Sequence, residues 1–273
     1  MPTEAVTTDQ GWGVLHLFFH LRRDVLADPH FDREAAGRQF AARIQAFGAR
    51  DGYQALVFSV LGQKADIGIM ALGPDLTALD AFHVALVSDP LGAALVPAAS
   101  YLSLTELSEY TSTETDETRR LVDEDGLAEG SAEHTEALNA FRERMSAYAE
   151  HRLHPQLPHK KVLSFYPMSK RRDGDDNWYA MDFPARKRLM AGHARVGRTY
   201  RGRVLQLITG STGLDDWEWG VTLLADDPGA LRDIVYEMRF DEVSARYGEF
   251  GPFVTGLVMQ PEDLLRHQGV LAP

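Results

Sequence analysis

The sequence contains no cysteine among its 273 residues. This absence excludes disulfide bonds, a thiolate nucleophile, and zinc or iron–sulfur sites that depend on cysteine ligands. Any bound metal must therefore be held by histidine, tyrosine or carboxylate side chains.

Long apolar runs and several well-known motifs are also missing. No stretch approaches the roughly 18–20 apolar residues of a membrane helix, and the opening MPTEAVTTDQ lacks the basic-then-apolar order of a signal peptide. We therefore expect a soluble, cytoplasmic protein without a membrane span. A Gly-x-Gly-x-x-Gly turn, a phosphate loop, HExxH and Gly-x-Ser-x-Gly are absent, so nucleotide-dependent and serine-hydrolase chemistry have no support.

Positive charge is in short supply. The chain has 28 Lys and Arg against 40 Asp and Glu, a net charge of −12, and an acidic surface repels the phosphates of nucleic acids. The charges are unevenly spread, because residues 106–150 hold 13 acidic and 4 basic side chains, whereas residues 151–172 hold 6 basic ones and no acid. Such a shift is typical of a connector that meets a functional or docking segment.

The hydrophobic pattern repeats one order of elements on both sides of this connector. The first half predicts strands at 13–21, 53–61, 65–72 and 100–110, and helices at 32–48 and 75–88. The second half predicts strands at 177–183, 203–209, 218–225 and 252–259, and helices at 184–197 and 227–242. One acidic helix is predicted in the connector, at 131–153.

Each half thus has the order βαββαβ, which is that of a ferredoxin-like unit. The predicted fold class is α+β, with two tandem ferredoxin-like units that form a dimeric α/β-barrel-type subunit. We predict an N-terminal unit at 1–110, an acidic helical connector at 111–160, and a C-terminal unit at 161–273 that carries the functional site.

His193 is the first candidate for chemistry. Leu189, Met190, His193 and Val196 share one stripe of the predicted helix, so the imidazole points toward whatever the apolar face covers. One interpretation is a core histidine bonded to a backbone carbonyl. The other is a neutral axial ligand of an iron porphyrin.

The second candidate is the segment FYPMSKRR at 165–172. It places a phenol, a thioether and three cations within eight residues, and it is either a strand end with a solvated basic loop or a site for a ligand with several negative charges. A third stretch, 234–250, predicts an amphipathic helix in which Arg239 and Ser244 are possible ligand contacts.

These segments carry a family resemblance. FYPMSKRR, NWY, RLMAGHARVGRTYRGRVLQLITGSTGLDDWEWGV and IVYEMRFDEVSARYGEFGPFVTG resemble the coproheme decarboxylases, the hydrogen-peroxide-dependent heme synthases of the chlorite dismutase superfamily. The resemblance is strong over 160–258, moderate over 12–110 and slight elsewhere. It implies two ferredoxin-like units per subunit and a homopentamer.

The resemblance also assigns roles to individual residues. Tyr166 matches the catalytic tyrosine, and His193 matches the axial ligand of the iron. Gln206 matches the residue above the iron on the opposite side, where chlorite dismutases are expected to carry arginine. The remaining positions match contacts to coproheme: Pro167, Met168, Ser169 and Lys170, with Lys170 as a propionate partner, then Arg152 and Ser244 at propionates, and Arg239 as a further propionate contact.

The implied reaction converts two propionates of iron-coproporphyrin III (coproheme) to vinyl groups, which gives heme b. Hydrogen peroxide is the oxidant and a Tyr166 radical takes a hydrogen from the propionate. Coproheme is then both substrate and cofactor, and the coproporphyrin ferrochelatase is a possible transient partner. The alternatives are a heme peroxidase or chlorite-degrading relative, a heme-binding protein without turnover, and a cofactor-free monooxygenase.

Overall fold

A computed structural model describes residues 4–273 of the chain. Its N-terminal half has the predicted order of elements: β1 (Gly13–Leu21), α2 (Arg33–Gly48), β2 (Gln54–Val60), β3 (Ile67–Gly73), α3 (Leu76–Ser88) and β4 (Leu95–Thr105). The strands pair antiparallel in the order β4-β1-β3-β2. Both helices begin at predicted positions because the Asp32 carboxylate accepts the Ala35 amide at 3.0 Å and the Asp75 carboxylate accepts the Thr77 amide at 2.9 Å.

The C-terminal half repeats this order, but its first strand lies earlier than predicted. That strand is β5 (Val162–Lys170), so the predicted strand at 177–183 was wrong. Asn177 instead begins a 3-10 turn, because its side chain accepts the amides of Tyr179 and Ala180. β5 is buried on both faces, so its sequence does not alternate as a half-exposed strand does.

The remaining elements include the predicted helix at 184–197 and the predicted strands at 203–209, 218–225 and 252–259, together with short elements that were not predicted. They are β6 (Arg172–Asp173), β7 (Asp176–Asn177), η2 (Trp178–Ala180), α6 (Phe183–Thr199), β8 (Val204–Gly210), β9 (Trp219–Ala225), α7 (Pro228–Met238), α8 (Glu242–Tyr247), β10 (Gly248–Phe250) and β11 (Val254–Met259). The strand order of this half is β11-β5-β9-β8. The α+β fold of two ferredoxin-like units is confirmed.

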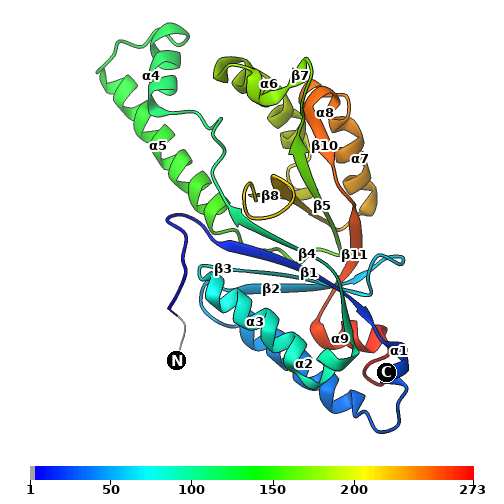
Figure 1. The fold of residues 1–273 in the computed structure, drawn as a ribbon. Coiled ribbons are helices and arrows are strands. Elements are labelled where there is room, and N and C mark those ends of the chain that lie inside the picture. Colours follow the sequence, from blue (N-terminus) through cyan, green and yellow to red (C-terminus); the bar gives the residue numbers. More distant parts are fainter. Residues whose placement is uncertain (1–3) are drawn as a thin grey trace.

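The two sheets close into one antiparallel barrel. β11 pairs with β2, β4 pairs with β8, and β9 pairs with β5, so eight strands form a complete ring, while β10 pairs with β5 outside it. Apolar side chains from both halves, among them Phe18, Phe58, Met70, Phe165 and Leu224, fill the interior. α2 and α3 cover the outer face of the first half, and α7 covers that of the second half, with α6 packed against α7 (Figure 1).

The connector contains two helices instead of the predicted one. α4 (Glu114–Asp123) and α5 (Ala132–Leu153) pack together and extend away from the barrel (Figure 1). α4 begins at a capping box in which Thr113 and Asp116 exchange side-chain and backbone hydrogen bonds. This helix lacks a long apolar stripe, which is why hydrophobic periodicity missed it.

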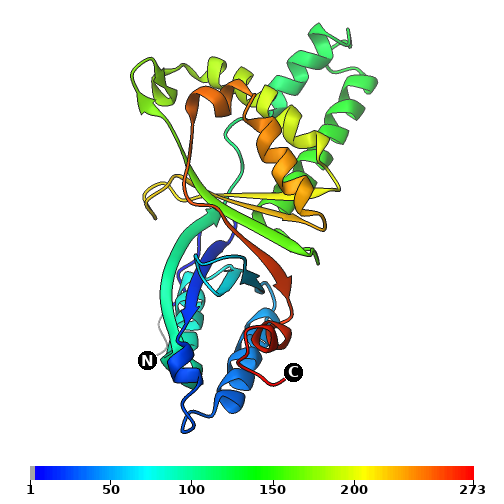
Figure 2. The same ribbon diagram turned by 90° about the vertical axis from the view of Figure 1, so that its right-hand side faces the viewer.

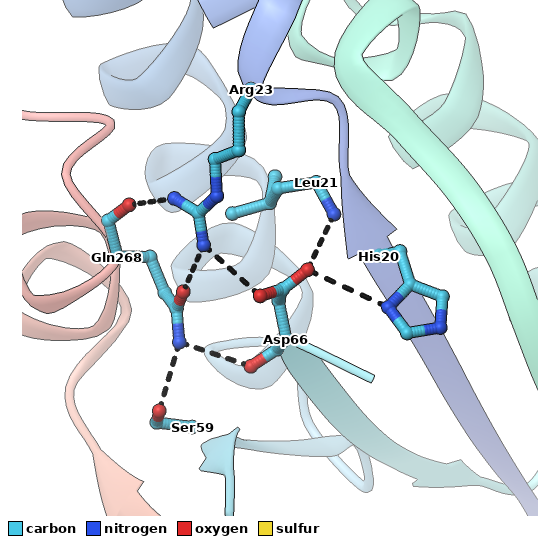
Figure 3. Close-up of polar contacts among 6 residues, drawn as sticks. All are labelled: His20, Leu21, Arg23, Ser59, Asp66 and Gln268. Carbon is cyan, nitrogen blue, oxygen red and sulfur yellow. Dashed lines mark hydrogen bonds and ion pairs between the residues drawn. The ribbon is translucent and has the colours of Figure 1, made fainter. Parts of the chain in front are cut away.

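The C-terminal tail packs on the N-terminal half (Figure 2). α9 (Pro261–His267) places Leu264 and Leu265 in the core beneath α2. Asp66 and Gln268 secure the tail, because Arg23 donates to both and Gln268 Nε2 donates to Ser59 Oγ at 2.9 Å (Figure 3). The predicted limits of 1–110, 111–160 and 161–273 stay a proposal, although α9, at the end of the third range, packs on the first unit.

None of the helices within residues 4–273 is both long and apolar enough to cross a bilayer.

Candidate functional site

The segment 166–170 lies within β5, and its side chains divide between two faces of the sheet. Tyr166 and Met168 belong to the core between the sheet and α7, whereas Phe165 lies inside the barrel. Because side chains alternate along a strand, Lys170 shares the helix-covered face with Tyr166, and Pro167 and Ser169 point the other way. Only three of the five predicted contacts in this segment therefore share the candidate site.

Tyr166 is held in a tight aromatic environment. Its side chain is 6% exposed, and its ring lies 4.2 Å from the ring centre of Phe253 and 5.9 Å from that of Phe250. Burial raises the pKa of Tyr166 to about 12, although the nearby Arg239 guanidinium acts in the opposite direction. The phenol therefore keeps its proton at neutral pH.

His193 is positioned by a carboxylate that the sequence did not predict. Its Nδ1 lies 2.8 Å from Oδ2 of Asp241, and the side chain is 26% exposed. Burial lowers the pKa of His193 below its ordinary value, while Asp241 raises it. In the neutral ring, the carboxylate can only accept, so Nδ1 carries the hydrogen and Nε2 keeps its lone pair free for a metal.

Asp241 occupies this place because one predicted helix is broken in two. The helix predicted at 227–242 ends at Met238, and Asp241 becomes the N-cap of α8, where its carboxylate accepts the amide of Ser244 at 3.3 Å. The Asp241 carboxylate therefore caps α8 and also contacts the His193 ring. The sequence signal for this helix start was Asp241 itself, an N-cap residue type. It was overlooked because the helical periodicity of 227–242 continues through this position and hides the break.

Lys170 supplies a buried positive charge beside this pair. The side chain is 7% exposed, and Nζ lies 4.8 Å from the ring centre of Trp178. Burial lowers the pKa of Lys170 to about 8, whereas Asp241 and Glu218 act to raise it. Nζ has no hydrogen-bond partner within residues 4–273, so this cation is available to an anionic ligand.

The other predicted residues lie around this centre at different positions. Arg239 is exposed, and its guanidinium lies 4.2 Å from the ring centre of Phe250. Gln206 is on the same sheet face, but its Nε2 donates to the Gly197 carbonyl at 3.0 Å, near the far end of α6. Arg152 reaches from α5 to the Ile208 carbonyl of β8 at 3.2 Å. Lys170, His193 and Ser244 therefore lie around Asp241. Tyr166 lies near Arg239, whereas Gln206 and Arg152 contact α6 and β8.

Two observations indicate that these residues fit an iron porphyrin with carboxylates. α6, at residues 183–199, has no fully buried side chain although Leu189, Met190 and Val196 form its apolar stripe, and it packs on α7 and α8. The Nε of Arg152 is buried without a hydrogen-bond partner in residues 4–273. Leu189 and Met190 already pack in part against Trp178, Val243 and Tyr247. A flat apolar ligand beneath α6 would cover what remains exposed of the stripe, and its carboxylates would meet the cations.

The chain matches one known protein family over most of its length. The family described as Chlorite dismutase matches residues 33–259. Two proteins, each named "Putative heme-binding protein", are 39% identical, one from Haloquadratum walsbyi over 266 residues and one from Natronomonas pharaonis over 263 residues. The matches cover 96% and 94% of this chain but only 46% and 40% of those proteins, so the chain spans less than half the length of these relatives.

Solved structures show the same fold. A heme-binding protein from Thermus thermophilus is 35% identical, with a TM-score of 0.78 and coverage of 98% of both chains. A mutant chlorite dismutase from Candidatus Nitrospira defluvii superposes with a TM-score of 0.70 over 95% of this chain and 96% of its own. At 17% identity the second likeness concerns the fold alone.

Proposed function

Because this chain belongs to the chlorite dismutase family, we propose that it binds an iron porphyrin between the C-terminal sheet and α6, with His193 as the axial ligand. We propose further that the porphyrin is coproheme and that the protein is a hydrogen-peroxide-dependent coproheme decarboxylase. The arrangement that carries the proposal is a buried, protonated Tyr166 and a buried Lys170 on one sheet face, next to a histidine whose Nε2 is free.

The chain's own residues have three tasks in this proposal. His193, held by Asp241, presents a neutral nitrogen to the iron. Lys170, Arg152 and Arg239 offset the charge of the propionates, while the half-buried stripe of α6 excludes water from one face of the ring. Tyr166 would give up a hydrogen atom to the oxidant and then take one from a substrate propionate.

The chemistry balances for each propionate. Bound iron and peroxide supply the oxidising power. The propionate loses carbon dioxide, one proton and two electrons and becomes a vinyl group, and one peroxide takes up the two electrons with two protons and becomes two waters. Two rounds give heme b, so the proposal requires two peroxides for two molecules of carbon dioxide.

The decisive experiment supplies the protein with ferric coproheme and peroxide and follows the porphyrin by mass spectrometry. We expect two successive losses of carbon dioxide. The variant Tyr166→Phe should bind coproheme almost as tightly as the natural protein but yield no heme b. Tyr236→Phe is the matched control, because this tyrosine is exposed on α7, and it should retain full conversion.

Other outcomes would assign other functions. A normal yield of heme b from Tyr166→Phe contradicts the proposal. Breakdown of chlorite without loss of carbon dioxide would identify a chlorite-degrading relative, and tight binding with no product would identify a heme-binding protein. We propose Gln206 as the residue on the opposite side of the iron, where its uncharged amide differs from the arginine expected in chlorite dismutases.

The proposal includes a cytoplasmic homopentamer that receives coproheme from the coproporphyrin ferrochelatase. Light scattering of the purified protein measures the number of subunits. Transfer of coproheme from the loaded ferrochelatase, compared with free coproheme at equal concentration, tests the delivery step, and equal rates would contradict direct transfer.

A further inference from the structure

Helix α6 and the turn after it carry an unusual concentration of positive charge. Residues 183–203 contain seven Lys and Arg and no Asp or Glu, whereas the rest of the chain carries a net charge of −19. This segment is therefore a local positive region on a strongly acidic protein, and it includes the histidine that we assign to the iron.

Three of these side chains form a stripe on the outer side of the helix. At about 100° per residue, Arg188, Arg195 and Arg198 fall within a wedge of roughly 80°, and His193 lies about 140° from Arg188. All three arginines are exposed. We call them the arginine stripe.

The arginine stripe has no counter-charge in the structure. Elsewhere on α6, Lys187 pairs with Asp116 at 2.7 Å and Arg186 lies 3.9 Å from Glu109. Within residues 4–273, Arg188, Arg195 and Arg198 make neither an ion pair nor a side-chain hydrogen bond. Their positive potential therefore extends into the solvent around the candidate site instead of being cancelled locally.

We propose that the arginine stripe is a capture surface, which speeds the arrival of porphyrins that carry several carboxylates. The inference rests on the proposed function, in which the substrate has four carboxylates and the product two. Attraction in a fixed potential grows with the ligand's charge, so the stripe favours the entry of coproheme over the return of heme b. It acts before contact, because it lies on the far side of the helix from His193.

Because the arginine stripe lies on the far side of α6 from His193, its effect on the association rate can be distinguished from an effect on the dissociation rate. A side chain that touches the bound ligand changes the dissociation rate, whereas a remote charge changes the association rate and loses its effect in salt. The triple variant Arg188→Gln, Arg195→Gln, Arg198→Gln should therefore associate more slowly with coproheme yet release it at the natural rate.

A stopped-flow measurement on the full protein tests this with ferric coproheme and with heme b. For coproheme we expect the triple variant to associate about three- to tenfold more slowly at 20 mM salt and less than about twofold more slowly at 500 mM salt. Heme b should show a smaller decrease at low salt, and both dissociation rates should stay within about twofold.

The matched control removes the same number of charges elsewhere. Arg22→Gln, Arg38→Gln, Arg266→Gln changes the net charge equally, but these side chains are paired with Asp24, Glu34 and Glu262. This variant should associate almost as fast as the natural protein. Far-ultraviolet circular dichroism and light scattering on both variants verify their fold and their assembly.

Several results would overturn the inference. The first three concern the association rate with coproheme: no change at low salt, equal slowing in the control variant, or slowing that persists at high salt. The fourth is a loss of assembly confined to the arginine-stripe variant, because this result would indicate that the stripe is a protein interface. Binding rates do not require turnover, so binding without release of carbon dioxide refutes only the proposed function. Failure to bind coproheme at all refutes both.

Discussion

The contact between His193 and Asp241 leads to the sharpest prediction. Asp241→Asn keeps the size of the side chain but removes the charge that accepts the Nδ1 hydrogen at 2.8 Å. A hydrogen bond to a charged group contributes about 1.5–3 kcal/mol, and an asparagine amide can donate to Nδ1 and thereby move the ring hydrogen to Nε2. Either effect weakens the ligand that we assign to iron.

The expected size follows from that contact. Loss of a partner that orients a metal-bound histidine costs about 10- to 100-fold in affinity, or about 1.4–2.7 kcal/mol. Asparagine caps a helix about as well as aspartate, so α8 should remain folded in Asp241→Asn. An alanine at this position would confuse the two effects, because it would also remove the cap.

Titration with ferric coproheme, followed by its Soret absorption, measures the affinity. The matched control is Asp182→Asn, because Asp182 caps α6 through the Ala185 amide at 2.8 Å and its side chain makes no contact with His193. Thermal melts of both variants report the fold. Affinity within about twofold of the natural protein with an unchanged spectrum would refute the assigned role of Asp241, as would an equal loss in the control.

Three further predictions concern stability. Burial lowers the pKa of His16 to about 3, so this side chain takes up a proton near neutral pH only in the unfolded chain. The free energy of unfolding should therefore fall as the pH drops below about 6.5. Between pH 7 and pH 5, His16→Gln should lose about 2 kcal/mol less of its unfolding free energy than the natural protein, as measured by urea unfolding. Asp66→Ala removes the acceptor of the Leu21 amide and of an arginine, and should lower the unfolding free energy by about 1–3 kcal/mol, whereas the exposed Asp24→Ala should change it by less than about 0.5 kcal/mol. Lys170→Met should stabilise the ligand-free protein by about 1–3 kcal/mol at pH 7, because it removes a buried charge. Titration with coproheme should show weaker binding to this variant. A destabilised variant would contradict the unpaired state of the Lys170 ammonium group.

Local patterns predicted most of the secondary structure. β1 was predicted with its observed limits although it is buried along most of its length, and the carboxylates of Asp32 and Asp75 mark helix starts. β5 was considered only as a strand end at 165–172, because Pro167 and the three cations that follow it are typical of a turn or loop. Because both faces of β5 are buried, its sequence also lacks the alternation of polar and apolar residues by which a half-exposed strand is recognised.

The candidate site was predicted in part. Tyr166, Lys170 and His193 were selected from their residue types and the family resemblance. The structure places Tyr166 and Lys170 on one face of β5 and Lys170 beside the pair of His193 and Asp241. Asp241 was missed because its role depends on a break between α7 and α8 and on a partner 48 positions away. Pro167 and Ser169 were included because they are neighbours in sequence, but a strand turns alternate side chains to opposite faces.

By itself, the sequence determined the repeat of βαββαβ, the absence of thiol chemistry and the uneven charge, because these depend on composition and short-range spacing. Only the tertiary structure decided that the two units close into one barrel, that the C-terminal tail packs on the first unit, and that Asp241 holds His193. These features depend on contacts between distant segments, whose geometry is set by strand register and helix breaks that no local pattern records.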